Sequence, residues 1–359
     1  MKEIEYKDFS LHTHKKNWKV KKPNVCQFEL TFGCALHCRH CYSDCYNKPS
    51  YIAKQLKTHE VKRILDKVYA AGVLWVCFTG GDPLAREDFL EIYAYAKHKG
   101  FLITLFTNAV SMTQKIASYL TAYPPFAIEI TVNAVSKVLY EHIAQVQGSF
   151  DKMKKGIKMI RDNGLPLKIK TQITKDNMHS IPEIKRFVED LGLDFCPSFR
   201  LYPRLNRDTT PCSLRIPIQE FLDTHTPDPA DCLAESAGKT TSADNLVFRC
   251  AAGGGDGFHI DPYGNIFLCN LIRQPSVNAL NKDINQALNT LEPFFKGRRF
   301  KTDSPCRSCD LKDLCRSCPG IAYLEKADME SPVPYFCNLA KMMQENKTKE
   351  VFHVQKAKV

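Results

Sequence analysis

At residues 33–41 the chain reads Gly-Cys-Ala-Leu-His-Cys-Arg-His-Cys, directly after an apolar stretch. Its three thiols, Cys34, Cys38 and Cys41, are close enough in sequence to hold one inorganic centre from a single loop at the end of a strand. A structural zinc site takes four protein ligands, and the fourth here would be Cys45. An iron–sulfur cluster normally takes four thiolates, so three of them leave one iron open to an exogenous ligand. The loop therefore predicts either a zinc site or a cluster with an open iron.

The composition is that of a globular enzyme. Its 359 residues allow one large domain and a smaller one with a substantial core. No run approaches eighteen apolar residues, and residues 1–22 are charged throughout, so we predict neither a membrane span nor a signal peptide. Sixteen cysteines without an export signal indicate free or metal-bound thiols in a reducing compartment, which predicts a cytoplasmic protein.

The chain is basic, with a formal net charge of +11. Part of this excess lies near the two ends, at residues 15–22 and 341–358. Neither segment interleaves aromatic residues with its charges, as proteins that bind single-stranded nucleic acid do. We therefore expect solvated basic ends and no nucleic-acid partner.

From residue 25 to about residue 201, short apolar runs alternate with longer amphipathic stretches. The runs that predict strands are 25–31, 73–79, 101–106, 127–132, 167–173 and 195–201. The stretches that predict helices are 58–71, 86–99, 113–120, 138–163 with a break at Gly148, and 180–191. Near-continuous apolar strands separated by helices indicate an α/β fold with a parallel sheet covered by helices. Because crossovers are right-handed, six such units predict an open, partial (β/α)6 TIM-like barrel with its active site at the carboxyl ends of the strands.

The spacing Cys-x3-Cys-x2-Cys, with His40 just before the third Cys, resembles the signature loop of the radical S-adenosylmethionine (SAM) enzymes. In that family the open iron of a 4Fe–4S cluster is chelated by the amino and carboxylate groups of SAM. The reduced cluster splits SAM into methionine and a 5′-deoxyadenosyl radical, which removes a hydrogen atom from the substrate. The resemblance implies the same six-unit barrel, cluster ligands at Cys34, Cys38 and Cys41, and His40 packed beside the SAM adenine.

Polar residues also follow the later strand candidates. The run Gly80-Gly81-Asp82-Pro83 resembles the family's G-G-E-P motif with Asp for Glu, which implies that this loop holds the SAM amino group. Glycines let the backbone approach a ligand, and carboxylate and carbonyl oxygens accept hydrogen bonds from an ammonium group. The resemblance further implies polar contacts to SAM from Asn108, Thr131 and Asn133, and from Arg200 to the SAM carboxylate.

Between residues 203 and 241 five prolines interrupt the periodicity and leave a short helical piece at 218–224, so we expect a connector. Cys212 and Cys232 lie in it. Each is expected to be a free thiol, and a thiol near the barrel mouth is also a candidate hydrogen-atom donor to a substrate radical.

A second Cys pattern runs from Cys250 to Cys337. A predicted hairpin with the turn Asp261-Pro262-Tyr263-Gly264 follows Cys250. The remaining thiols are Cys269, which closes a Gly-x4-Cys run, the group Cys306-x2-Cys309-x5-Cys315-x2-Cys318, and Cys337. Seven thiols exceed one tetrahedral site by three and suit two clusters that need up to eight ligands.

This pattern resembles the SPASM extension of radical SAM enzymes, a small Cys-rich α+β domain that binds two auxiliary 4Fe–4S clusters. Carried over in order, the nearer cluster takes Cys250, Cys269 and Cys318, and the farther one takes Cys306, Cys309, Cys315 and Cys337. The last Cys pair is separated by two residues where the family has three, which leaves open which thiols serve which cluster. The nearer cluster lacks a fourth thiolate, so either Asp256 supplies an oxygen or the iron is open to substrate. The structural alternative is a pair of zinc knuckles.

We therefore divide the chain into five parts. They are a basic N-terminal extension (1–23), a radical SAM partial barrel (24–202), a connector (203–241), a SPASM-like auxiliary cluster domain (242–340) and a basic C-terminal tail (341–359).

Relatives with this extension mostly modify peptides or proteins, so we predict an enzyme that abstracts a hydrogen atom from a ribosomally made peptide or protein. Sulfatase activators have an Asp directly after the Gly-x4-Cys cysteine; Asn270 stands there and cannot take a proton, which argues against formylglycine formation. Only 33 residues precede Cys34, too few for a leader-binding module, so we expect a separate peptide-presenting protein or direct recognition by the barrel mouth. The expected electron donor is a flavodoxin or a ferredoxin.

Two alternatives stay open. One is small-molecule cofactor biosynthesis of the haem or quinone type by the same radical chemistry. The other is a non-catalytic iron–sulfur or zinc protein that senses redox state or carries electrons.

Overall fold

A nine-stranded sheet organises the chain in the computed structural model, which describes residues 4–19, 22–221, 245–250, 252, 257–315 and 317–356. The strands are β1 (Val25–Thr31), β2 (Trp75–Gly80), β3 (Leu102–Thr107), β4 (Ala127–Thr131), β5 (Leu167–Gln172), β6 (Cys196–Ser198), β7 (Gly257–Ile260), β8 (Asn265–Phe267) and β9 (Val277–Asn278). Their order across the sheet is β6-β5-β4-β3-β2-β1-β7-β8-β9. Strands β1 to β6 are parallel, so the predicted partial (β/α)6 barrel is confirmed.

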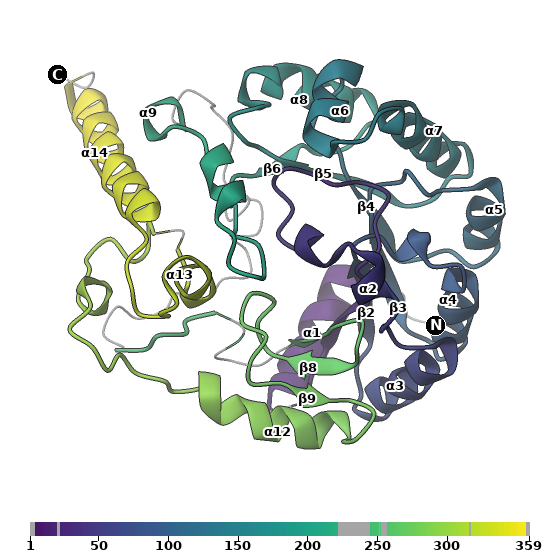
Figure 1. Cartoon of the computed structure of the whole chain (residues 1–359). Helices are drawn as coiled ribbons and strands as arrows, with labels where there is room; N and C mark the ends of the chain where they lie inside the picture. Colours follow the sequence, from purple (N-terminus) through teal and green to yellow (C-terminus); the bar gives the residue numbers. More distant parts are fainter. Residues whose placement is uncertain are drawn as a thin grey trace.

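The described helices lie around and beside this curved sheet. They are α1 (Tyr6–Lys19), α2 (Pro49–Ile52), α3 (Thr58–Ala70), α4 (Phe89–His98), α5 (Gln114–Ala122), α6 (Lys137–Ala144), α7 (Ser149–Asp162), α8 (Ile181–Asp190), α9 (Ile218–Phe221), α12 (Ile284–Phe295), α13 (Pro319–Lys326) and α14 (Pro334–Lys356). Figure 1 shows that α3, α4, α5, α7, α6 and α8 cover the outside of the strands, in that order around the sheet. The predicted break at Gly148 is present, since Gly148 has a φ of 75° between α6 and α7.

Strand alternation gives the sheet two different faces. Phe28, Phe78 and Ile128 are 0% exposed and form the core under the helices. The opposite, concave face carries polar residues that keep partial exposure, such as Gln27 and Glu129. The barrel interior is therefore chemically suited to a polar ligand.

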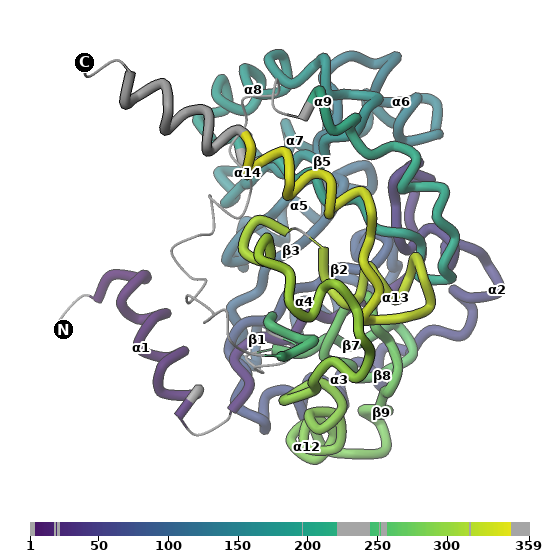
Figure 2. Tube along the Cα trace, turned by 90° about the vertical axis from the view of Figure 1, so that its left-hand side faces the viewer, coloured from purple at the N-terminus to yellow at the C-terminus, as the bar shows by residue number. Residues whose placement is uncertain are grey.

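The C-terminal region extends the barrel sheet. Strand β7 pairs in parallel with β1, and β8 and β9 follow in antiparallel order, with the predicted turn between β7 and β8. The long-range pairing of β7 with β1 was not anticipated from the sequence. In Figure 1, α13 and the adjoining loops lie on the side where the two edge strands β6 and β9 do not meet. Figure 2, turned by 90°, shows α12 at the opposite end of the molecule from α8.

The N-terminal segment is packed against the barrel, although we expected a solvated basic end. Trp75, at the start of β2, donates from Nε1 to the Tyr6 hydroxyl at 3.0 Å and stacks on His14 at 4.8 Å. Phe126 lies 4.7 Å from the Tyr6 ring. Helix α1 therefore covers the amino-terminal end of the central strands, opposite the carboxyl ends. Among the described helices, none combines the length and apolarity of a membrane span.

Candidate active site

The loop that carries the first three thiols is fastened at both ends by hydrogen bonds. Gly33 N donates to Thr31 Oγ1 at 2.8 Å, which turns the chain out of β1. The Asn47 side chain donates to the carbonyls of Cys34 and Leu36, each at 3.1 Å, and accepts from Cys34 N at 3.1 Å. Further along, Arg39 N donates to the carbonyl of Ile143 in α6. Asn47 is a positioning residue that the sequence analysis missed.

Cys34, Cys38 and Cys41 are partly buried and close enough to affect one another electrostatically. Burial raises the pKa of the Cys38 thiol, and the neighbouring Cys41 and Cys34 raise it further. Burial likewise raises the pKa of Cys34, with Asp82 and Cys41 adding to the shift. Burial makes it costly to deprotonate these thiols. Binding to a metal centre offsets that free-energy cost, because the metal takes the place of the proton on sulfur. The three predicted ligands thus lie together.

The donor set fits a cluster better than a zinc ion. Among the described residues, no three His, Cys, Asp or Glu side chains converge as the ligands of a single metal ion do. Cys45, the alternative fourth zinc ligand, is buried, and its thiol points to the Tyr42 carbonyl at 3.8 Å. Thiolates that hold a 4Fe–4S cluster bind different irons and are therefore more widely separated.

The glycine loop after β2 lies against the start of the Cys loop. Gly81 N donates to Thr31 O at 2.7 Å, and Asp82 N donates to Gly33 O at 2.8 Å. A Cβ at Gly81 would lie 2.4 Å from Gly33 O, and one at Gly80, whose φ is 138°, would lie 2.0 Å from Thr31 O. Neither position can hold a side chain without moving the Cys loop.

Asp82 is fully buried, and its carboxylate is used within the protein. It accepts hydrogen bonds from Leu84 N at 2.9 Å, from Thr107 Oγ1 at 2.8 Å and from Asn108 N at 3.0 Å. These hydrogen bonds give the carboxylate a positioning role, because they tie the glycine loop to the end of β3. Pro83, which follows, begins a short 3-10 helix and is also buried.

Asn108 joins the glycine loop to the first thiol. Its backbone N–H is held by Asp82, its Oδ1 accepts from Val110 N at 2.9 Å, and its Nδ2 donates to Cys34 Sγ at 3.2 Å. An amide that donates to a ligand sulfur raises the reduction potential of an iron–sulfur centre. The structure therefore places Asn108 beside a cluster ligand.

His40 and Asn133 meet at the end of β4. Asn133 Oδ1 accepts from Gln172 N at 2.9 Å, so its amide nitrogen faces His40 Nε2 at 3.4 Å. An amide nitrogen only donates, which leaves the His40 proton on Nδ1. That Nδ1 is buried and without a partner among the described residues. Burial lowers the pKa of His40 to about 4, so the ring is neutral at pH 7 and presents one unused donor, which suits a SAM acceptor atom.

Two other predicted SAM residues lie differently. Thr131 ends β4 on the concave face, level with Lys170 of β5. Burial raises the pKa of Tyr202, and the nearby Arg200 opposes that rise. Arg200 also lowers the pKa of Cys318, which burial raises. Arg200 therefore lies near the second thiol group.

The second thiol group comprises Cys250, Cys269 and Cys318. Burial raises the pKa of Cys269 to about 11, and both other thiols add to it. Burial raises the pKa of Cys318. A hydrogen bond from the backbone N–H of Ile321, at the start of α13, acts in the opposite direction. Gly320 allows this approach, because a Cβ there would lie 2.8 Å from the Leu271 side chain.

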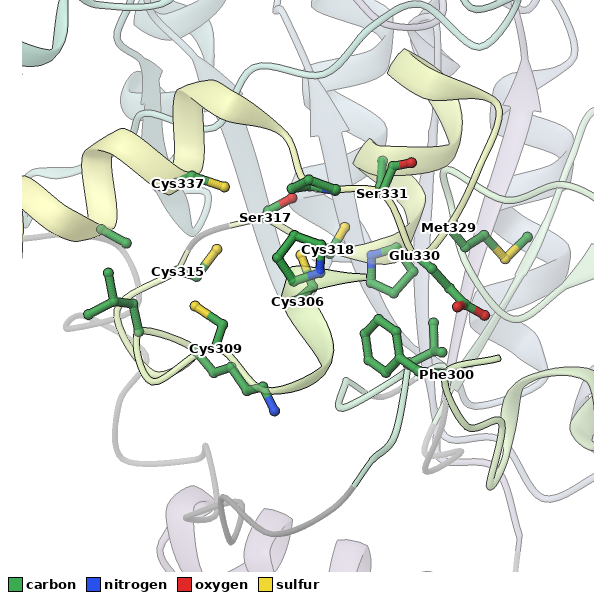
Figure 3. A pocket seen from close by; sticks show the side chains of 18 of the residues that line it. Phe300, Cys306, Cys309, Cys315, Ser317, Cys318, Met329, Glu330, Ser331 and Cys337 are labelled. Atoms are coloured by element: carbon green, nitrogen blue, oxygen red, sulfur yellow. The ribbon is translucent and has the colours of Figure 1, made fainter. Parts of the chain in front are cut away.

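The third thiol group comprises Cys306, Cys309, Cys315 and Cys337. Burial raises the pKa of Cys315, and the three other thiols of this group raise it further. The group lines a cavity of about 510 Å³, and Figure 3 shows the four sulfur atoms around a common space. Cys318 also borders this cavity, but its electrostatic partners are those of the second group.

A buried ion pair lies between the first and second groups and was not predicted. Arg273 donates to both oxygens of Glu29 at 2.7 Å, and Glu29 is 1% exposed. Nothing in the local sequence indicates this pair, because its members are 244 positions apart.

Several thiols remain outside these groups. Cys26 is fully buried, as expected for a core thiol, while Cys77 on the concave side is half-buried. Cys212 lies 3.9 Å from Glu325, and burial raises its pKa to about 11. Cys232 and Asp256 lie outside the described residues, as does the side chain of Cys196.

The comparisons with known proteins agree with this geometry. The chain is 24% identical over 337 residues to "AdoMet-dependent heme synthase" of Methanosarcina barkeri, covering 87% of this chain and 96% of that relative. It is 25% identical over 336 residues to "PqqA peptide cyclase" of Granulibacter bethesdensis, covering 87% of each. The fold is similar to that of Streptococcus suis SuiB bound to precursor peptide SuiA, with a TM-score of 0.68, 17% identity and coverage of 90% and 78%. Residues 28–191 match the Radical SAM superfamily model, so the chain contains a radical SAM domain.

Proposed function

We propose that this enzyme abstracts a hydrogen atom from a ribosomally made peptide or protein and so matures it, by crosslinking, thioether formation or a related change. The observation that carries the proposal is the full-length similarity to PqqA peptide cyclases, on a fold shared with SuiB, whose structure contains a precursor peptide. The concave face of the sheet carries partly exposed polar residues, which suit a polar substrate such as a peptide segment.

In this proposal Cys34, Cys38 and Cys41 hold the radical-generating cluster. When bound, the cluster and SAM supply a 5′-deoxyadenosyl radical. The backbone of Gly80 and Gly81 approaches the amino-acid part of SAM. Asp82 keeps that loop in place through the Thr107 hydroxyl and the Asn108 N–H.

Further residues contact the rest of SAM. His40 offers its neutral Nδ1–H to an acceptor atom of SAM, and Asn133 fixes the ring in that tautomer. Thr131 lies on the concave face next to them. For Arg200 we propose a role near the second thiol group.

We further propose two auxiliary 4Fe–4S clusters. Cys306, Cys309, Cys315 and Cys337 form a complete set of four thiolates, and their mutual electrostatic effects support it. Cys250, Cys269 and Cys318 form an incomplete set, which leaves a position for another ligand. Anaerobically reconstituted protein is then expected to bind about twelve irons per chain, against about four if only the first cluster forms.

The remaining partners follow from this chemistry. A low-potential donor such as a flavodoxin or ferredoxin supplies the electron, and a separate protein presents the peptide if the barrel does not recognise it alone. The free and metal-bound thiols require a reducing compartment, which favours the cytoplasm.

The experiment that tests the function is mass spectrometry of short peptides encoded beside this gene. Each is incubated anaerobically with reconstituted enzyme, SAM and dithionite. A peptide that loses two hydrogens while 5′-deoxyadenosine accumulates supports a crosslinking maturase. The Cys38→Ala variant is the matched control, since it lacks one thiol of the first group.

A second candidate is maturation of a haem-precursor tetrapyrrole, because the heme synthase of M. barkeri aligns with nearly its whole length. The exposed Lys168 on the concave face offers positive charge for a carboxylate, whereas the charge of Lys170 is already paired with Glu129. The same incubation with a carboxylated iron tetrapyrrole separates the two candidates: conversion there, with every peptide unchanged, replaces the peptide proposal.

A further inference from the structure

One side chain from the first Cys loop meets one from the second thiol group. Tyr42 follows Cys41, and Asn270 follows Cys269. Asn270 Nδ2 donates to the Tyr42 hydroxyl oxygen at 2.9 Å. Tyr42 also packs with Cys269 and Cys318 against the apolar cluster around α13.

The orientation of the Asn270 amide follows from its other neighbour. Arg273 Nη2 lies 3.3 Å from Asn270 Oδ1. A guanidinium group has donors only, so the amide oxygen faces Arg273 and the amide nitrogen faces Tyr42. Arg273 is itself held by both carboxylate oxygens of the buried Glu29. Because Arg273 is fixed in this way, the Asn270 side-chain amide cannot flip.

This orientation decides the direction of the Tyr42 hydroxyl. An amide nitrogen donates and cannot accept, so the Tyr42 oxygen must accept this bond and its proton must point elsewhere. No described residue accepts that proton. The nearby Tyr202 ring stands edge-on to the Tyr42 ring, with the ring centroids 6.4 Å apart. A partly buried hydroxyl with an unused proton is a donor available to a ligand.

We propose that the Tyr42 hydroxyl is a hydrogen-bond donor for an oxygen of the substrate, held between the SAM site and the second thiol group, and that Asn270 is its positioning residue. The inference rests on the proposed function only in the identity of that oxygen: a backbone carbonyl if the substrate is a peptide, a carboxylate if it is a tetrapyrrole acid. The acceptor chemistry is the same in both.

The residue type at position 270 matters for this role. A carboxylate at position 270 would accept hydrogen bonds from both Arg273 and the Tyr42 hydroxyl. The Tyr42 proton would then point toward position 270. Asn270→Asp is therefore expected to turn the Tyr42 hydroxyl proton toward position 270 and away from the substrate, while keeping the shape of the side chain.

The first test needs no substrate. Infrared difference spectra of protein labelled with ring-¹³C tyrosine isolate the Tyr42 band by comparison with Tyr42→Phe. The phenol C–O stretch differs between a hydroxyl that accepts and one that donates, so Asn270→Asp is expected to shift this band. Asn285→Asp, at an exposed position in α12, is the matched control. An unchanged Tyr42 band in Asn270→Asp overturns the assigned direction.

The second test uses the modified peptide found by mass spectrometry, or the tetrapyrrole if no peptide reacts. Loss of one hydrogen bond predicts that the apparent KM rises about tenfold in Tyr42→Phe and in Asn270→Asp, with kcat reduced less. Iron content, measured beside each assay, excludes a loss of folding as the cause. An unchanged KM in both variants, for whichever substrate reacts, overturns the proposal; failure of all peptides alone overturns only the proposed function.

Discussion

The Asp82 carboxylate accepts the Thr107 hydroxyl at 2.8 Å in a fully buried position, and this bond ties the glycine loop after β2 to the end of β3. The same carboxylate holds Asn108, which in turn donates to Cys34. Asp82, Asn108 and Cys34 are thus joined by successive hydrogen bonds. A substitution at one of them is expected to displace the next.

Replacing Asp82 by Asn is expected to weaken both folding and SAM cleavage. One carboxylate oxygen becomes an NH2 group facing a donor, which leaves a buried polar group unpaired and costs about 1–3 kcal/mol of the free energy of unfolding. Urea denaturation measures the stability, and chromatography measures 5′-deoxyadenosine. Asp151→Asn, which breaks an exposed pair with Lys137, is the control and should change the stability by less than about 1 kcal/mol. Wild-type 5′-deoxyadenosine formation in Asp82→Asn would contradict its positioning role.

Gly81→Ala is expected to displace the first cluster. Its Cβ would lie 2.4 Å and 2.5 Å from the backbone oxygens of Gly33 and Phe32, which cannot move without moving the Cys loop. Reconstituted protein should lose about four irons and 5′-deoxyadenosine formation. Gly100→Asn is the control, because Asn tolerates the positive φ there and a Cβ meets nothing within 4 Å. Full iron content in Gly81→Ala would count against the observed contact.

The three thiol groups are expected to behave as separate units. Cys38→Ala should lose about four irons and all 5′-deoxyadenosine formation, while Cys309→Ala should lose about four irons with a different electron paramagnetic resonance signal. Cys212→Ser, outside all three groups, should keep the full iron content. Retained SAM cleavage in Cys38→Ala would contradict the assignment of the first group.

The connector is predicted to depend on one buried ion pair. Arg215 and Glu325 are 6% and 12% exposed and join the segment after β6 to α13. Glu325→Ala leaves the guanidinium buried without its partner, which should lower the free energy of unfolding by about 3–5 kcal/mol. Asp162→Ala, which removes an exposed i,i+4 pair with Lys158, should cost at most about 0.5 kcal/mol. Equal losses of unfolding free energy in Glu325→Ala and Asp162→Ala, measured by urea denaturation, would contradict this prediction.

His259 is expected to make the protein less stable as pH falls. Burial, followed by Arg273, lowers its pKa to about 4 from an ordinary value of 6.5. The unfolded chain therefore takes up a proton below pH 6.5 that the folded chain does not, so stability is present above pH 6.5 and is lost toward pH 4.

Between pH 7 and pH 5 this proton accounts for about 2 kcal/mol. His259→Phe keeps the ring packing on Phe267. Between pH 7 and pH 5 the variant should therefore lose about 2 kcal/mol less of its free energy of unfolding than the wild type does. His98→Phe, an exposed histidine in α4, is the control. An identical pH slope in wild type and His259→Phe would exclude the buried neutral ring as the cause.

Local pattern accounts for what could be predicted from the sequence. The bounds of β1 agree with the expected run, in which apolar and polar residues alternate up to the start of the Cys loop. The first thiol group comes from one short loop, residues 34–41, whereas Cys250, Cys269 and Cys318 are far apart in sequence and were grouped by the family resemblance. Helix α1 was missed because its residues are mostly polar, and its helical state depends on packing against Trp75.

Contacts between distant parts of the chain could not be predicted. The Glu29–Arg273 pair, the bonds to Asp82 and the position of Arg200 beside Tyr202 each join segments that only the folded sheet brings together. The motif correctly indicated that Asp82 belongs to the site. It did not reveal that neighbouring hydrogen-bond donors already occupy the carboxylate.

The most direct test of the account is deuterium transfer into 5′-deoxyadenosine. Peptides encoded beside the gene are made with fully deuterated residues and incubated anaerobically with reconstituted enzyme, unlabelled SAM and dithionite. The account predicts that one peptide transfers deuterium to 5′-deoxyadenosine and is itself modified, and that Cys38→Ala forms no 5′-deoxyadenosine. Abundant 5′-deoxyadenosine without deuterium from any peptide would contradict hydrogen abstraction from a peptide.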